Sequence, residues 1–186
     1  MTVYFTASIA GKKEYCNNYL AIIGILQRNG YKVISDHIIK TTTETIKKEE
    51  KEARLKFHTQ LEKWIKSCDF VVAETSYPSI SVGYEISLAI NLGKPLLILY
   101  TGDNLPTLFI HYQEGAIICK KYTLDNLTNI IANFIKSTKN SADVKFTFFI
   151  TKEMANFLKK ISLKERISKS VYLRDLIQHE IKEALT

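Results

Sequence analysis

The chain has 186 residues, of which 46% are hydrophobic, 24% charged and 11% aromatic, and its net charge is +7. This composition is typical of a globular protein and excludes a wholly disordered chain, and no apolar run approaches the roughly 20 residues of a membrane helix. The first ten residues lack the pattern of a signal peptide, and three scattered cysteines offer neither a disulfide framework nor a metal spacing. We therefore expect a cytoplasmic protein that binds no metal.

Short apolar runs alternate with segments of helical periodicity in the first three quarters of the chain. In chain order we predict a strand at 3–5, a helix at 15–29, a strand at 31–35, a charged helix or loop at 41–56, a helical face from 55 to 65, a strand at 69–74, a helix from 79 or 82 to 92, a strand at 96–100, a weaker strand at 116–119 and a helix at 125–136. This order predicts an α/β fold, a Rossmann-like five-stranded parallel sheet with helices on both faces.

Polar residues gather where the predicted strands end. The four stretches are 6–11, 36–37, 74–85 and 100–107. Because ligands of open parallel sheets bind at the carboxyl ends of the strands, we expect a binding site there.

The pattern changes after a polar stretch, so we divide the chain into an α/β domain at 1–138, a linker at 139–143 and a tail at 144–186. The tail carries nine Lys and Arg against five Asp and Glu, and so holds +4 of the net charge. An alternating strand at 144–150 precedes two amphipathic helices, the second capped by Ser168. Since a lone strand leaves its edge unpaired, we expect a homodimer. The basic charge fits DNA, with a solvated lysine surface as the alternative.

The segment PSISVGYE, residues 78–85, joins a buried strand to a helix and is the strongest chemical signal. Its backbone N–H groups, with the hydroxyls of Ser79 and Ser81, can bind an anion at the helix start. We place Glu85 in the first helical turn, where the helix dipole favours the ionised carboxylate. Such a carboxylate suits nucleophilic attack on an anomeric carbon, and the alternative is a glutamate that only complements the dipole.

Three separated blocks carry a resemblance to a known family. They are YFTASIAG at 4–11, VISDH at 33–37, and DFVVAE at 69–74 followed by YPS at 77–79 and VGYE at 82–85. Together with Trp64, they resemble the signature of the nucleoside 2-deoxyribosyltransferase family, closest to its 2'-deoxynucleoside 5'-phosphate N-hydrolase branch. The resemblance covers residues 3 to about 135.

The resemblance implies a flavodoxin-like sheet and cleavage of the N-glycosidic bond of deoxynucleosides or their 5'-monophosphates, with no metal or organic cofactor. It places the nucleophile at Glu85, assisted by Tyr4. The substrate-binding positions that it implies are Ser8, Ile9, Gly11, His37, Ser79, Ser81 and Gly83. Ser8 and Ser79 would hold the phosphate, and His37 would lie near the sugar.

The chain departs from the family pattern at several positions. Ala10 replaces an arginine of the first loop, although Lys12 and Lys13 follow it, and Ser81 replaces a glycine. The family aspartate that lies 24 positions before the glutamate falls on Leu61. Three explanations stay open: another acid such as His58 or Glu62 takes over, the substrate differs, or activity is lost.

The tail resembles a ribbon-helix-helix unit of the Arc/MetJ type, in which paired strands of a dimer read the major groove. The resemblance gives Lys145, Thr147 and Lys169 as possible DNA contacts, and the alternative is a dimerisation unit without DNA. Two functions follow for the whole chain. The favoured one is hydrolysis or base transfer at the N-glycosidic bond through a covalent glutamyl-deoxyribosyl intermediate. The rival is a DNA-binding regulator whose α/β domain senses a nucleotide.

Overall fold

The computed structural model describes residues 1–48, 50–102, 117–140, 148–165 and 167–184, and the chain forms two compact units, Met1–Lys145 and Phe146–Thr186. Residues 103–107 of the predicted polar stretch, residue 116 of the predicted strand, and residues 141–147 of the predicted linker and tail lie outside the described residues. No helix in the described ranges is long and apolar enough to cross a membrane.

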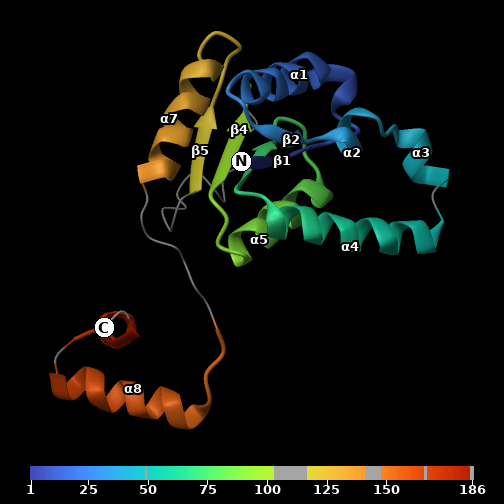
Figure 1. Cartoon of the computed structure of the whole chain (residues 1–186). Helices are drawn as coiled ribbons and strands as arrows, with labels where there is room; N and C mark the ends of the chain where they lie inside the picture. Colours follow the sequence, from blue (N-terminus) through green and yellow to red (C-terminus); the bar gives the residue numbers. More distant parts are fainter. Residues whose placement is uncertain (49, 103–116, 141–147, 166, 185–186) are drawn as a thin grey trace. The chain divides into compact units, whose positions relative to one another are not determined.

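The first unit is built on a single parallel sheet (Figure 1). Its strands are β1 (Thr2–Ala7), β2 (Lys32–Ile34), β3 (Phe70–Glu74), β4 (Leu96–Tyr100) and β5 (Ile117–Lys121). The spatial order is β2-β1-β3-β4-β5, and every neighbouring pair is parallel. The prediction of a five-stranded, Rossmann-like parallel sheet is confirmed, and the order is that of flavodoxin-like folds.

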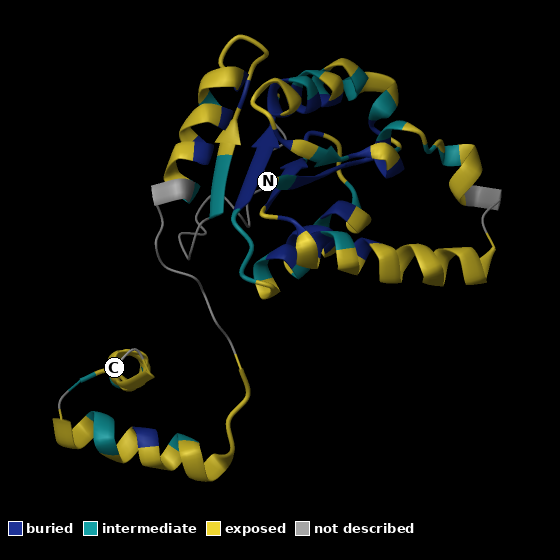
Figure 2. Ribbon diagram, in the orientation of Figure 1, coloured by how far each residue is buried: buried dark blue, intermediate teal, exposed yellow. Residues whose placement is uncertain are grey.

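Helices cover both faces of this sheet, as predicted. The helices of this unit are α1 (Lys12–Arg28), α2 (Asp36–Ile39), α3 (Thr43–Lys48), α4 (Lys51–Ser67), α5 (Ile80–Asn91) and α7 (Leu127–Asn140). Successive strand residues point to opposite faces, so Val3 and Phe5 pack in the core beneath α1 and α7, whereas Tyr4 packs with α4 and α5. The central strands β1, β3 and β4 are the most deeply buried, whereas β5 at the edge is half-buried to exposed (Figure 2).

Several helices differ from the predictions: α1 begins at Lys12 rather than at 15, and α2 was not predicted. α7 continues past the predicted end at 136, because Ser137 and Thr138 bond their hydroxyls to the carbonyls of Phe134 and Ile135 and so fit a helix. α4 begins at Lys51, and residues 51–60 are all exposed, so its first half extends beyond the sheet. That charged stretch is therefore largely helical rather than a loop.

The second unit contains α8 (Lys152–Glu165) and α9 (Lys169–Ala184). Ser168 accepts a hydrogen bond from the backbone N of Val171 at 3.2 Å, which is the N-cap that the sequence predicts. Of the apolar side chains described in this second unit, only Leu158 is buried. Residues 148–150 form no strand, and the rest of the predicted strand lies outside the described residues.

Candidate active site

The strand order reverses at β1, so the chain leaves β1 toward one face of the sheet and leaves β3 toward the other. α1 follows β1 and packs on one face, whereas α5 follows β3 and packs on the opposite face. A crevice at the carboxyl ends of the strands is the usual binding place at such a switch point. The loops at 8–11 and 75–79 meet at this point.

Glu85 and Tyr4 form a buried pair beneath that edge. Glu85 is 5% exposed, and the Tyr4 hydroxyl donates a hydrogen bond to its Oε2 at 3.0 Å. Burial raises the pKa of Glu85, and the hydroxyls of Thr6 and Tyr4 act in the opposite direction. Burial, followed by the charge of Glu85, raises the pKa of Tyr4 far above its ordinary value. Tyr4 therefore stays protonated and serves Glu85 as a hydrogen-bond donor.

The expected position of Glu85 in the first helical turn is wrong. Ser79 is the N-cap of α5, with its Oγ accepting from the backbone N of Val82 at 3.4 Å, so the helix begins at Ile80. Glu85 then lies in the second turn, and no acidic residue occupies the first. Because the dipole effect falls off within the first turn, the ionised carboxylate is favoured by Tyr4 and not by the helix start.

Thr6 lies in the polar stretch 6–11 and in the block at 4–11, but it was not named among the candidate site residues. It is fully buried and lies on the same strand face as Tyr4, two residues away. Its hydroxyl lies beside Glu85 without a well-formed hydrogen bond of its own. Strand periodicity from Tyr4 was the signal that could have found it.

His37 lies in α2 at the centre of an aromatic cluster, and it is 8% exposed. Its ring stacks on Tyr4 with centroids 5.0 Å apart, and Trp64 and Phe57 flank it at 5.3 and 6.1 Å. Burial lowers the pKa of His37 to about 4, although Asp36 opposes the shift. Neither ring nitrogen has a hydrogen-bond partner among the described residues. The imidazole is thus neutral at pH 7 and carries unused polar atoms.

The first loop is held by Ser8 and Gly11. Ser8 is buried, and its Oγ accepts from the backbone N of Gly11 at 3.2 Å. A Cβ at Gly11 would lie 2.5 Å from Cβ of Tyr77, so only glycine lets the two loops approach. Ile9 is half-buried against the core. Lys12, a candidate source of positive charge, instead donates to the carbonyls of Ile39 and Thr41 at 2.7 and 2.9 Å.

The second loop leads into α5. The Ser79 hydroxyl can still donate its proton while it accepts from Val82, because a hydroxyl has one donor and two acceptor sites. Ser81 is exposed in the first turn of α5, next to Gly83. A Cβ at Gly83 would meet nothing within 4 Å, so packing alone does not require glycine there.

A second buried carboxylate, Glu74, lies on the opposite side of the sheet. Its Oε1 accepts from the backbone N of Ser76 and from the Tyr122 hydroxyl, each at 3.2 Å, and from the Ser76 hydroxyl. Ser76 Oγ in turn accepts from the backbone N of Thr101 at 2.8 Å. Glu74 therefore ties the second loop to β4 and β5.

Leu61, at the position of the family aspartate, is buried among apolar side chains of the α4 and α5 face. The neighbouring His58 and Glu62 lie on the exposed side of α4 and contact Tyr84 of α5. The position of the family aspartate therefore holds no acid. The two alternative acids, His58 and Glu62, lie close together beside Tyr84.

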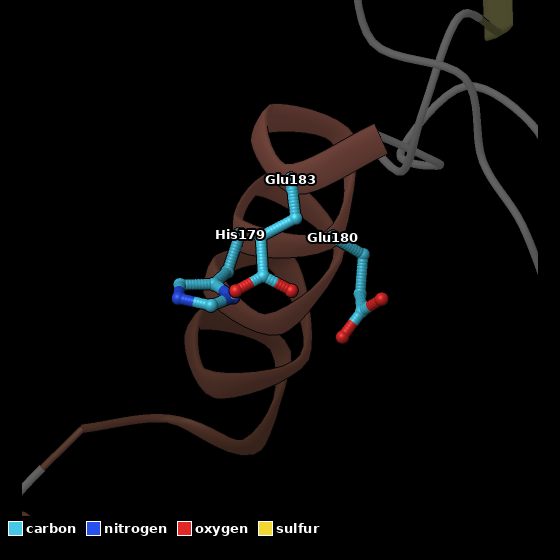
Figure 3. Close-up of side chains that lie close together, drawn as sticks. All are labelled: His179, Glu180 and Glu183. Carbon is cyan, nitrogen blue, oxygen red and sulfur yellow. The ribbon is translucent and has the colours of Figure 1, made fainter. Parts of the chain in front are cut away.

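The possible DNA contacts Lys145 and Thr147 lie outside the described residues, and Lys169 is exposed at the start of α9. Further along that helix, His179, Glu180 and Glu183 place their ligand atoms within 4.8 Å of one another (Figure 3). All three are exposed on a single helix, and such clusters are common without an ion, so we infer no metal site from them.

No protein-family model matches the sequence. The 5-hydroxymethyl-dUMP N-hydrolase of Rattus norvegicus is 38% identical over 99 residues, covering 53% of this chain and 60% of the rat protein. The match thus spans less than two thirds of that relative's length. A protein of Syntrophotalea carbinolica classed as a 2'-deoxynucleoside 5'-phosphate N-hydrolase is 35% identical, covering 74% of this chain and 96% of the relative.

Among solved structures, a Clostridium botulinum CMP N-glycosidase aligns with a TM-score of 0.49 and 16% identity, over 71% of this chain and 99% of that chain. A likeness of this degree carries no conclusion about activity. The sequence relatives are the informative comparison.

Proposed function

The chain belongs to the family of 2'-deoxynucleoside 5'-phosphate N-hydrolases, and on that premise we propose that it cleaves the N-glycosidic bond of a 2'-deoxynucleoside 5'-monophosphate. The buried hydrogen bond of 3.0 Å between Tyr4 and Glu85 carries the proposal. It supplies an oriented carboxylate in a water-poor setting at the switch point of the sheet, which is what attack on C1' needs.

In the proposed reaction Glu85 attacks C1' of the sugar and the base departs, which leaves a deoxyribosyl ester on the enzyme. Water then hydrolyses the ester and restores the carboxylate. Tyr4 holds the carboxylate in place throughout, because its own proton is firmly bound. Resolution by a second base instead of water would make the chain a transferase.

The direct test is incubation of the protein with each 2'-deoxynucleoside and each 5'-monophosphate, followed by chromatography for free base. Release of base from a monophosphate supports the proposal, and the base identifies the substrate. Transfer is detected by adding a second, labelled base and looking for a new nucleotide. A protein that binds a deoxynucleotide without releasing base would favour the rival function, a nucleotide-sensing regulator.

The two loops offer a setting for the 5'-phosphate. Ser8 lies in the loop after β1, and Ser79 begins α5, whose first N–H groups and dipole attract an anion. Gly11 brings these loops into contact through Tyr77. In our proposal Ile9, in the first loop, and Ser81 and Gly83, at the start of α5, also contact the substrate. His37 lies near the sugar in this proposal, with its ring stacked on Tyr4.

Ser79→Asp is expected to separate phosphate binding from helix capping. Aspartate is as good an N-cap as serine, so Tm should stay near that of the wild type. Its negative charge would repel a phosphate, so kcat/KM for a monophosphate should fall by roughly 100-fold or more, while cleavage of the matching nucleoside changes little. Ser79→Thr keeps both the cap and the hydroxyl and serves as the control. Equal losses for nucleoside and monophosphate would show that Ser79 does not contact phosphate.

The tail, in our proposal, makes the protein a homodimer. α8 and α9 expose a set of large apolar side chains that two helices cannot cover by themselves. They include Met154, Phe157, Leu163, Val171, Leu176, Ile177 and Ile181. The alternating sequence that precedes α8 suits pairing with the same segment of a second copy. No contact in the described part of the tail favours DNA, so DNA binding stays a prediction from the sequence.

Light scattering on the full chain and on a chain that ends at Asn140 tests the tail. The full chain is expected to be at least a dimer, and the shortened chain is expected to have a lower oligomeric state with the α/β fold retained, since that unit has its own core. Circular dichroism and base release of the shortened chain are the controls. A monomeric full chain would contradict a ribbon-helix-helix tail.

A further inference from the structure

Cleavage of an N-glycosidic bond needs a proton as well as a nucleophile. A nucleobase that departs as an anion is a poor leaving group, and an enzyme accelerates such a step with a positioned general acid. Leu61 faces the core of the α4 and α5 side and has no proton to give. The donor must therefore be another side chain near Glu85.

The buried groups beside Glu85 are unsuited to this task. Burial raises the pKa of Tyr4 so far that it holds its proton. Burial lowers the pKa of His37 to about 4, so its ring has no proton to give as an acid at neutral pH. Glu74 lies on the other face of the sheet, bonded to Ser76 and Tyr122.

A polar cluster bridges α4 and α5, and one of its members, Tyr84, directly precedes Glu85. The Nε2 atom of His58 lies 2.8 Å from the Tyr84 hydroxyl, and the two rings are tilted with centroids 5.4 Å apart. Glu62, one turn after His58, places its Oε1 3.7 Å from His58 Nδ1 and 3.5 Å from the Tyr84 hydroxyl. His58 thus has a hydrogen-bond contact at Nε2 and a carboxylate within ion-pair distance of Nδ1.

Tyr84 links this cluster to the helix that carries Glu85. Tyr84 directly precedes Glu85 on α5, and the charge of Glu85 is one cause of the raised pKa of Tyr84, after burial and Glu62. The side chains of His58 and Glu62 are about half exposed, at 50% and 48%, so a substrate can reach them. Histidine is the side chain that enzymes most often use as a general acid.

We propose that His58 is the general acid for the leaving base, with Glu62 and Tyr84 as the positioning residues that orient its ring. The assignment rests on the proposed function, since it supplies the proton that this reaction requires. The Glu62 carboxylate lies within ion-pair distance of Nδ1, where its charge stabilises an imidazolium, as a carboxylate does for histidine in hydrolases. Nε2–H then turns from the Tyr84 hydroxyl to the base.

The two half-reactions balance in atoms and charge. In the first, a bond forms between a Glu85 oxygen and C1', the C1'–N bond breaks with its electron pair on the base, and His58 gives the base a proton. In the second, water attacks C1' of the ester and the Glu85 carboxylate leaves. His58 takes the proton of that water and is again an imidazolium. The products are the free base and 2-deoxyribose 5-phosphate.

The decisive experiment compares two leaving groups. One substrate is the deoxynucleoside 5'-monophosphate that the wild type cleaves. The other is 2-deoxyribose 5-phosphate that carries a p-nitrophenoxy group at C1', and this group departs as p-nitrophenolate without protonation. His58→Asn is expected to lower kcat/KM for the nucleotide by roughly 100-fold or more, and for the p-nitrophenyl substrate by only a few-fold. Glu62→Gln should show the same selectivity to a smaller degree.

His179→Asn is the matched control, because His179 also pairs with a glutamate one turn later on an exposed helix, at 3.6 Å. It should leave both rates unchanged. If His58→Asn changes both substrates equally, or neither, the assignment of His58 is overturned while the proposed function stands. If the wild type cleaves neither substrate, the proposed function fails, and this inference fails with it.

Discussion

Glu85→Gln is expected to lower kcat/KM for base release by roughly 10⁴-fold or more, with the α/β fold intact. Loss of a covalent nucleophile costs several kcal/mol of barrier, and each 1.36 kcal/mol is a factor of ten in rate. Glutamine keeps the size of the side chain and an oxygen that can accept the Tyr4 hydrogen bond, so only the nucleophilic charge is lost. The rate is measured as free base, and the covalent ester by intact-protein mass spectrometry.

Stability gives this variant a second readout that distinguishes a lost nucleophile from a lost fold. Burial raises the pKa of Glu85, so the protonated carboxyl contributes favourably to the free energy of unfolding. This contribution is complete below the ordinary glutamate pKa and is lost as the pH rises through the raised pKa. Glutamine has no charge to bury, so Glu85→Gln should have a higher Tm than the wild type at pH 7, and the difference should shrink toward pH 4. Glu52→Gln, on the exposed half of α4, is the control. Full activity of Glu85→Gln would overturn the assignment of Glu85 as the nucleophile.

Local sequence was sufficient for most of the α/β fold. Strands such as Leu96–Tyr100 are continuous apolar runs between a Gly-Lys-Pro turn and a polar loop, so their bounds follow from neighbouring residues. The end of α7 was harder to predict from the sequence, because Ser137 and Thr138 are residue types typical of a linker. In the structure their hydroxyls donate hydrogen bonds to helix carbonyls. The four-residue helix α2 is too short to have a recognisable period.

The site was predictable only where its residues belong to one motif. Glu85 was identified, but the helical turn that holds it depends on which residue caps α5, and this residue is Ser79 rather than a later one. The cluster of His58, Glu62 and Tyr84 could not be predicted, since it depends on how α4 crosses α5. Likewise, the burial of His37 could not be predicted, because the ring of Trp64 that packs against it lies 27 positions later in the sequence.

His37→Phe is expected to remove an acid-sensitive part of the free energy of unfolding, of about 3 kcal/mol. Burial lowers the pKa of His37 from 6.5 to about 4 in the folded protein. Between these two values the unfolded chain binds a proton that the folded chain does not bind, so the stability of the wild type falls as the pH drops from about 6.5 to 4. Phenylalanine keeps the stack on Tyr4 but cannot titrate, so the variant should lack this part of the decline.

Urea unfolding of wild type and His37→Phe at a series of pH values measures the difference. His179→Gln is the control, because His179 is exposed and its replacement should leave the decline unchanged. At pH 7 the variant should be at least as stable as the wild type, since it buries no unpaired ring nitrogens. Its kcat/KM should nevertheless fall, because His37 lies near the sugar in our proposal. Equal pH dependence in wild type and His37→Phe would mean that the ring is protonated in the folded protein, and a neutral His37 could then not be part of the site.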